Sequence, residues 1–302
     1  MSEVIPLFPL SSPLFPGIVL PLEIFEDRYR RLVADLVALP SGSPRRSFGV
    51  VAIRQGWEVE RVAPAAALYD VGCTARVQGV RAKPDGGFRI VTVGGDRFRL
   101  LDVLVGDDPP YLQGRVEWLA REEAAEDAAG DREGLVGGTA PPPDGGPDEG
   151  GTGADEDPDE DAEEVRRAVA VGSMSVLVRG VRDLFSAYVA EVAALRLGWD
   201  ETGLDLLDGD LPAGAEDDAD RIGARTSALL DGVSGDPRAL SWLVASAALL
   251  TTEDRQALLA VSATRRRLAA ESRLLRRELT LLQRIGAVPA PLREFATPMT
   301  VN

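Results

Sequence analysis

The chain has 302 residues, 45% of them apolar, and a formal net charge of −16; it contains no histidine, one cysteine and one lysine. This length is enough to bury about two hydrophobic cores, so we expect about two domains. The absence of histidine excludes Ser-His-Asp and Cys-His catalytic arrangements and removes the commonest zinc ligand. A single cysteine allows no internal disulfide, which fits a reducing compartment.

Residues 1–119 carry the pattern of a mostly β domain. Five short runs are β-branched or alternate apolar with polar residues, as half-buried strands do: residues 47–53, 74–79, 88–93, 98–103 and 111–119. The sequence Pro-Asp-Gly-Gly at residues 84–87 predicts a hairpin between the second and third runs. The sequence Gly-Gly-Asp-Arg at residues 94–97 predicts another corner between the third and fourth runs.

One helix is expected among these strands. Its apolar face consists of residues spaced three and four apart: Phe25, Tyr29, Leu32, Val33 and Leu36. We expect this face to cover one end of a small barrel, because closing a sheet of short strands removes the exposed edges that would otherwise pair between chains.

Residues 120–164 form an acidic segment. They contain seventeen of the 49 acids and two of the 33 bases, which leaves 32 acids and 31 bases in the rest of the chain. The part of the chain that we expect to fold is therefore nearly neutral. Blocks of like charge that also contain many prolines and glycines stay solvated, so we predict a disordered acidic insertion between two domains.

Residues 165–288 are predicted to form a helical bundle, followed by a tail at residues 289–302. The apolar residues within 165–197 recur at helical spacing, which indicates a helix. Gly172 and Gly180 lie inside this helix and predict a break in it.

The rest of the bundle shows start signals and a long final helix. Residues 200–220 hold nine acids and no base and are expected to form a loop. Asp236 before Pro237, and the sequence Thr-Thr-Glu-Asp at residues 251–254, predict two helix starts. The last helix is predicted from leucines that recur every seven residues: Leu268, Leu275 and Leu282.

Several segments, in their order and spacing, resemble the substrate-binding N-terminal domain of Lon proteases. They are residues 5–10, 14–22, 25–32, 68–75, 86–100 and 110–118 in the first half, and residues 236–240, 249–259 and 266–282 in the second. The resemblance implies an α+β fold in which a PUA-like β pseudo-barrel is followed by a C-terminal helical bundle with a long last helix.

The resemblance also implies a function. In Lon proteases this arrangement first engages unfolded or tagged protein substrates, so we expect a non-enzymatic protein- or peptide-binding module. The sequence ends at Asn302, where a full Lon protease would continue into an ATPase and a peptidase. We therefore expect a stand-alone Lon-domain protein, an adaptor or holder of unfolded segments for proteolysis.

The residues offer no catalytic constellation, and we expect neither a metal nor a cofactor. Lys83 precedes Pro84 in a predicted turn, so it fits neither a phosphate-binding loop nor a Ser-Lys peptidase dyad. Cys73 lies in a strand-like run and is expected to be a small buried residue. Residues 155–161 lack the glycine that a calcium-binding EF-hand needs at the sixth loop position.

The candidate peptide-binding residues surround one proline-flanked aromatic. They are Leu14, Phe15, Pro16, Gly17, Tyr29 and Trp118. Prolines on both sides hold this loop extended, and Phe15 could then be an exposed anchor for a bound chain. In the alternative interpretation Phe15 fills the barrel and Gly17 only makes the turn, since large aromatic side chains are mostly buried. Tyr29 and Trp118 have the same two interpretations.

Three functions from different classes are compared. Binding of unfolded or apolar protein segments, together with a protease partner, is favoured by the resemblance. A PUA-like nucleic-acid-binding protein is the alternative, although a neutral folded part with an acidic insertion repels phosphates. A stand-alone peptidase is disfavoured because the chain has no histidine to act as the catalytic base and its lysine lies in a predicted turn.

The sequence also bears on localisation. Glu3 and the early prolines do not make a signal peptide, and no apolar run reaches the ~20 residues of a membrane span. We therefore expect a cytoplasmic protein that does not bind membranes, and the oligomeric state stays open.

Overall fold

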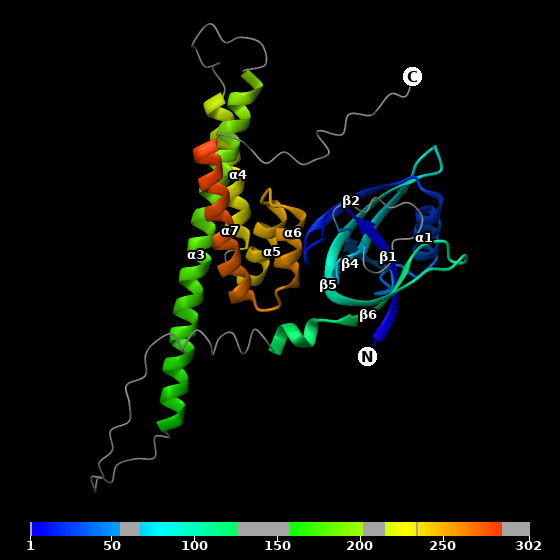
Figure 1. Cartoon of the computed structure of the whole chain (residues 1–302), viewed down its shortest axis with the longest axis horizontal. Coiled ribbons are helices and arrows are strands. Elements are labelled where there is room, and N and C mark those ends of the chain that lie inside the picture. Colours follow the sequence, from blue (N-terminus) through cyan, green and yellow to red (C-terminus); the bar gives the residue numbers. More distant parts are fainter. Residues whose placement is uncertain (1, 55–66, 126–157, 202–214, 234, 286–302) are drawn as a thin grey trace, which may run out of the picture.

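A computed structural model describes residues 2–54, 67–125, 158–201, 215–233 and 235–285 (Figure 1). The strands are β1 (Ser2–Leu10), β2 (Val19–Ile24), β3 (Ser47–Ala52), β4 (Val71–Ala82), β5 (Phe88–Leu104) and β6 (Gln113–Trp118). The helices are α1 (Asp27–Val37), α3 (Pro158–Glu201), α4 (Ala215–Gly232), α5 (Pro237–Ala247), α6 (Thr252–Ala260) and α7 (Thr264–Ile285). Figure 1 shows α5 and α6 between the strands and the pair formed by α3 and α7.

Five of the strands close into a ring. β1 runs parallel to β3 and antiparallel to β6, and antiparallel pairs join β3 to β4, β4 to β5, and β5 to β6. β2 pairs with β5 from outside this ring. Together with the helices that follow, this arrangement confirms the predicted pseudo-barrel followed by a helical bundle with a long last helix.

β5 is one strand of 17 residues, where the sequence predicted a corner at residues 94–97. The register between β4 and β5 shifts between Cys73 and Ala75, so the strand carries an irregularity opposite these residues without ending. Gly94 instead permits a close contact, because a Cβ atom at this position would overlap the carbonyl group of Phe15. The predicted hairpin turn at residues 84–87 is confirmed, and Gly86 takes a positive φ of 79° there.

Helix α1 covers the barrel with the face that the sequence predicted, except at its first residue. Tyr29, Leu32, Val33 and Leu36 are buried in the barrel core. Phe25 lies before the helix and is 69% exposed, so its assignment to this face was wrong. The reason is local: Glu26 has an extended backbone, and only from Asp27 does the helical spacing apply.

The helical half departs from the prediction at three places. α3 is continuous through Gly172 and Gly180, where a break was predicted. A Cβ atom at either glycine would meet no neighbour, so these residues cost the helix ~1 kcal/mol each without opening it. α4 begins at Ala215, inside the stretch 200–220 that was predicted to be a loop. Residues 120–125 are helical and α3 begins at Pro158, both within the acidic segment; residues 126–157 and the predicted tail lie outside the described residues.

Two predicted helix starts are confirmed by their caps. The Asp236 side chain accepts hydrogen bonds from the backbone N–H groups of Arg238 (2.9 Å) and Ala239 (3.0 Å). The Thr251 hydroxyl accepts one from the N–H of Asp254 at 3.1 Å. Each cap satisfies backbone donors that the first turn of a helix leaves without a partner. Within the described residues, no helix is both long and apolar enough to cross a membrane.

The barrel and the bundle share a hydrophobic core. One cluster of buried residues joins Phe15 and Val71 from the barrel side to Trp242, Leu258 and Leu259 from α5 and α6. A second cluster lies within the bundle and includes Leu268, Leu275 and Leu282 of α7, as predicted, and a third lies within the barrel. The two halves are therefore packed against each other through apolar side chains.

The contact at Gly94 gives a testable prediction. Substitution Gly94→Ala places a methyl group against the Phe15 backbone and is expected to lower the free energy of unfolding by about 1–3 kcal/mol or more. The matched control is Gly79→Ala on the neighbouring strand β4, where a Cβ atom would meet nothing within 4 Å. Urea unfolding followed by circular dichroism measures both variants. Equal losses in the two variants would contradict the assigned role of Gly94.

Candidate protein-binding surface and the interdomain junction

The loop predicted to bind peptide is mostly part of the interdomain core. Phe15 is 1% exposed and Leu14 is also buried. The Phe15 ring lies 5.9 Å from the Trp242 ring of α5, measured between centroids, and the Arg255 guanidinium lies 5.7 Å from its centre. Phe15 is therefore not an exposed anchor; it fills the core, as the alternative interpretation expected, although part of that core belongs to the bundle.

The other predicted residues lie apart from this loop. Tyr29 stacks on Phe8 in the barrel core with 4.1 Å between ring centroids, and burial raises the pKa of its hydroxyl. Trp118 is partly buried at the end of β6, and its indole N–H donates to the Glu3 carboxylate at 3.0 Å. Gly17 is exposed, with a φ of 76° in the turn that leads into β2. The structure does not bring the six residues into one surface.

An exposed apolar surface does lie on β2 and β5. Val19 is 59% exposed and Val91 is 39% exposed, and the exposed Pro21 is the cross-strand partner of Val91. We call these three residues the β2 surface. On its other side Val91 pairs with Gly79 of β4. A Cβ atom added to Gly79 would meet no neighbour within 4 Å. The lack of a side chain at Gly79 leaves the flank of Val91 open.

The sequence of β2 carries a signal for this surface. Residues 18–22 read Ile-Val-Leu-Pro-Leu, so apolar residues occupy both faces of the strand. A strand with one solvated face normally alternates apolar with polar residues. Leu20 and Leu22 pack against the core, which leaves Val19 and Pro21 on the outer face.

β2 also has an edge that no strand pairs with in the described part of the chain. The backbone N–H of Gly94 donates to the Ile18 carbonyl, which fixes the pairing of the strands that follow. In this register Leu20 and Leu22 direct their backbone groups toward β5. The N–H and C=O groups of Val19 and Glu23 therefore point to the open edge, together with the carbonyl of Pro21.

Charged residues flank the β2 surface. Glu23 accepts hydrogen bonds from Arg89 and from Lys83, and these bonds lower the pKa of the Glu23 carboxyl. The same contact raises the pKa of Lys83, which is therefore held protonated and unsuited to act as a base. Arg76 and Arg81 are exposed on the neighbouring strand β4.

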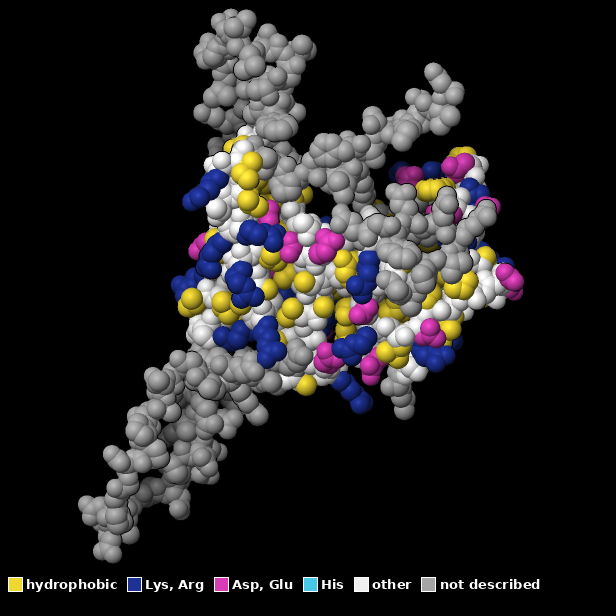
Figure 2. Space-filling view, in the orientation of Figure 1, with side chains coloured by type: hydrophobic (Ala, Val, Ile, Leu, Met, Phe, Trp, Pro, Cys, Tyr) yellow, Lys and Arg dark blue, Asp and Glu magenta, His cyan; other side chains and the backbone are white. Residues whose placement is uncertain are grey.

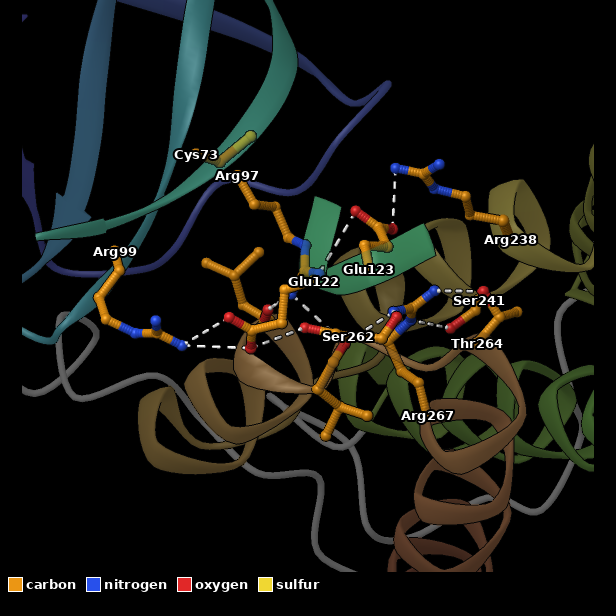
Figure 3. Close-up of polar contacts among 12 residues, drawn as sticks. Cys73, Arg97, Arg99, Glu122, Glu123, Arg238, Ser241, Ser262, Thr264 and Arg267 are labelled. Atoms are coloured by element: carbon orange, nitrogen blue, oxygen red, sulfur yellow. Dashed lines mark hydrogen bonds and ion pairs between the residues drawn. The ribbon is translucent and has the colours of Figure 1, made fainter. Parts of the chain in front are cut away.

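A buried arginine connects the barrel to the bundle (Figure 3). Arg97 of β5 is 2% exposed and donates from Nη1 to the Leu259 carbonyl at the end of α6, at 2.6 Å. Its guanidinium also lies 5.4 Å from the centre of the Trp242 ring and 3.4 Å from a carboxylate oxygen of Glu123. These contacts compensate a charge that would otherwise be costly to bury.

Two glutamates of the 120–125 helix complete the junction. Glu123 pairs with Arg97 and also with Arg238 of α5, at 2.8 Å. Glu122 accepts two hydrogen bonds from one nitrogen of Arg99, at 3.0 and 3.1 Å, and one from the Ser262 hydroxyl at 3.5 Å. Figure 3 shows this helix between the barrel strand and the bundle. The start of the acidic segment is thus attached to both halves.

A second buried polar group supports Trp242 from within the bundle. The Arg267 guanidinium lies 3.4 Å from the centre of the Trp242 ring and donates to the Ser241 hydroxyl at 2.7 Å. Ser241 in turn donates to Glu271 at 2.6 Å. Burial raises the pKa of the Glu271 carboxyl to about 8, against the opposing effects of Ser241 and Arg267.

The geometry favours binding over proton transfer. Cys73 is fully buried, burial raises the pKa of its thiol, and its Sγ donates to the Gly95 carbonyl at 3.4 Å, so the thiolate is disfavoured. Among the described residues, no group of three or more acidic or cysteine side chains could hold a metal ion.

The comparison with protein families decides the relationship. Residues 4–277 match the family model described as the ATP-dependent protease La (LON) substrate-binding domain. The chain belongs to this family. The match covers both the barrel and the bundle, so the resemblance seen in the sequence is confirmed.

Two curated relatives match the first part of this LON-family chain. The Lon protease of Anaeromyxobacter dehalogenans is 32% identical over 129 residues, and Lon protease 2 of Myxococcus xanthus is 30% identical over 128 residues. Each match covers 42% of this chain and 14% of the relative. The chain therefore matches only a small part of each protease.

Two solved structures are similar over most of the LON-family chain. A Lon N-terminal domain protein from Xanthomonas campestris is 20% identical, with a TM-score of 0.44, over 91% of this chain and 98% of its own. The N-terminal domain of the Mycobacterium avium complex Lon protease is 17% identical, with a TM-score of 0.42, over 92% and 98%.

The junction predicts that Arg97 is essential for stability. Arg97→Met leaves Glu123 buried with one fewer cation and the Leu259 carbonyl without its donor, so we expect a loss of about 3–5 kcal/mol in the free energy of unfolding. Arg99→Met breaks the partly exposed pair with Glu122 and is expected to cost less than about 1 kcal/mol. Urea unfolding measures both. A smaller loss for Arg97→Met than for Arg99→Met would refute this assignment.

Glu271 predicts a pH dependence of stability. Its pKa in the folded chain, about 8, lies above the ordinary value of 4.5, so between these pH values the folded state binds the proton that the unfolded state has lost. Stability therefore decreases as the pH rises from 4.5 to 8, with a slope of up to about 1.4 kcal/mol per pH unit. Glu271→Gln should remove this contribution, whereas Glu253→Gln, at an exposed position, should not. Urea unfolding measures the free energy of unfolding of each chain between pH 4.5 and 8. The same pH dependence in the wild type and in Glu271→Gln would contradict the role assigned to Glu271.

Proposed function

We propose that this chain is a substrate-recognition module that holds extended apolar segments of other proteins on the β2 surface and presents them for proteolysis. The observation that carries the proposal is the exposure of Val19, Pro21 and Val91 on the adjacent strands β2 and β5. Apolar side chains that gather on a surface typically mark an interaction site.

The open edge of β2 suits an extended ligand. An incoming strand could pair with the N–H and C=O groups of Val19 and Glu23, while its side chains meet the β2 surface. Backbone pairing of this kind is independent of sequence. Unfolded proteins expose both backbone groups and apolar side chains, so they offer both of the contacts that the site needs.

Neighbouring residues extend the proposed site. Phe25 follows β2 directly and is strongly exposed, which adds an aromatic side chain at that end of the strand. Pro16 and Gly17 precede β2 at its other end, and they stay in the proposal as candidate contact residues. Leu14 and Phe15 support the site indirectly, because their burial against the bundle holds the loop before β2 in place.

The relatives support the choice of ligand class. The family model is described as a substrate-binding domain, and the relatives are named Lon proteases, whose substrates are proteins. We therefore propose that the ligand is protein, that a protease is a further partner, and that the chain acts in the cytoplasm as an adaptor.

The test uses the full chain and an unfolded protein. The double variant Val19→Ser/Val91→Ser is expected to bind fluorescein-labelled, reduced and carboxymethylated lactalbumin at least about tenfold more weakly than the wild type, because truncating central apolar contacts removes most of an interface's binding energy. Fluorescence anisotropy measures the dissociation constants. The control Val4→Ser/Val176→Ser changes exposed valines on β1 and α3 and should bind as the wild type does.

Two results would reject the proposal. One is equal binding by the wild type and the Val19→Ser/Val91→Ser variant. The other is binding of single-stranded RNA that exceeds lactalbumin binding and falls steeply with salt, because that dependence is characteristic of phosphate contacts. Apolar contacts to lactalbumin should instead persist when salt is raised.

A further inference from the structure

The solvent-facing side of α7 carries only positive charge. Arginines at intervals of seven, four and seven residues fall along one line of the helix, and one more lies beside them; this arginine stripe consists of Arg266, Arg273, Arg276, Arg277 and Arg284. All five are exposed, whereas the two acids of α7, Glu271 and Glu278, are buried. Figure 2 shows dark blue side chains gathered over the side of the molecule where α3 and α7 lie.

Much of this charge is not neutralised locally. Arg277 pairs with Asp254 and Glu278, at 2.6 Å in each case. Arg273, Arg276 and Arg284 make no ion pair with any acid in the described ranges of the chain. A helix face that concentrates guanidinium groups in this way attracts a polyanion.

We propose that the arginine stripe is the docking site for the acidic segment 126–157 of the same chain. This segment carries ten acids and a single base, Arg132. Its charge is therefore complementary to the stripe. Each exposed ion pair contributes little alone, so the docking depends on several pairs that form together.

The ends of the segment lie where this docking requires them. Its first end follows the 120–125 helix, whose Glu122 accepts a hydrogen bond from Ser262, two residues before α7 begins. Its second end leads into α3, and Ser173 of α3 accepts a hydrogen bond from Arg265 in the first turn of α7, at 2.8 Å. The first end of the segment thus lies near the start of α7, and the second end leads into the helix that packs against this start at Ser173.

The segment is also long enough. The stripe extends roughly 27 Å from Arg266 to Arg284 at the rise of an α-helix. Pro158 lies roughly 22 Å along α3 from Ser173 by the same measure. A chain of this length can span roughly 105 Å when extended, more than a path out along the stripe and back to Pro158 requires. Because the segment is covalently attached, its concentration at the stripe is on the order of millimolar, which favours it over free polyanions.

The test measures the distance between the segment and the stripe in the full chain. Cysteines are introduced by Asp144→Cys in the segment and by Thr280→Cys, an exposed position on α7, and are labelled with a pair of fluorescent dyes. Cys73 is fully buried and stays unlabelled. Energy transfer should be high at low salt and fall at least about twofold in 1 M NaCl, where the screening length is about 3 Å. Without docking, screening would relieve self-repulsion within the segment and raise the transfer.

Substitutions identify the partner surface. The triple substitution Arg273→Gln/Arg276→Gln/Arg284→Gln is made in this labelled chain. At low salt it should lower the energy transfer to the value that the unsubstituted labelled chain shows in 1 M NaCl. The control Arg45→Gln/Arg81→Gln/Arg115→Gln changes three exposed arginines of the barrel and should leave it unchanged. Far-UV circular dichroism is used to check that both variants are folded. Energy transfer that responds to neither salt nor the stripe substitutions would overturn the proposal.

A binding measurement separates the segment from an outside ligand. The variant replaces five acids of the segment by the corresponding amides: Asp148, Glu149, Asp155, Glu156 and Asp157. Labelled poly-L-glutamate should bind this variant at least about tenfold more tightly than the wild type, because the segment no longer occupies the arginine stripe. Equal affinity for wild type and variant would count against docking. Tight binding of single-stranded RNA by the wild type, lost on the three stripe substitutions while energy transfer stays constant, would show that the stripe serves nucleic acid and would overturn the proposal. Lactalbumin binding to the β2 surface is measured in a separate experiment. Failure of the proposed function and failure of the proposed docking can therefore be told apart.

Discussion

The position of the barrel against the bundle depends on one buried charge, the guanidinium of Arg97. It is compensated by the Leu259 carbonyl, the Glu123 carboxylate and the face of Trp242, which come from three different elements. Removing any of these elements would leave an uncompensated charge in the interior, which costs several kcal/mol. The barrel, α5, α6 and the start of the acidic segment therefore stabilise one another through this charge.

This dependence explains why the loop before β2 is buried. Phe15 contacts Trp242, which also contacts Arg97, so the loop belongs to the same packed region. The N–H of Gly17 then donates to the Gly94 carbonyl at 2.8 Å and starts the pairing of β2 with β5. The buried aromatic thus fixes the strand whose outer face carries the proposed site. A binding strand held in this way loses little conformational freedom when a ligand pairs with it.

Local signals in the sequence predicted local structure well. The hairpin at residues 84–87, the caps Asp236 and Thr251, and the leucines of α7 each depend on neighbours within a few residues. Features set by distant contacts were missed. Gly94 was interpreted as a turn residue, although its role is contact with the Phe15 backbone, and no pattern indicated that Arg97 would be buried. For the candidate site, proline-flanked Phe15 predicted an exposed anchor but is buried by a distant contact with the bundle, whereas the apolar run of residues 18–22 is a local pattern that marks the exposed face of β2.

Pro21 has a consequence for how molecules of this protein meet one another. An open strand edge with apolar side chains invites the same edge of a second copy, and pairing of that kind joins two copies into a dimer. Proline cannot donate a hydrogen bond, and in the register of β2 its nitrogen lies on the open side. Two copies aligned edge to edge would each lack a donor at the centre of the shared ladder. The same residue that adds apolar contact to the outer face thereby disfavours pairing of β2 with β2 of a second copy.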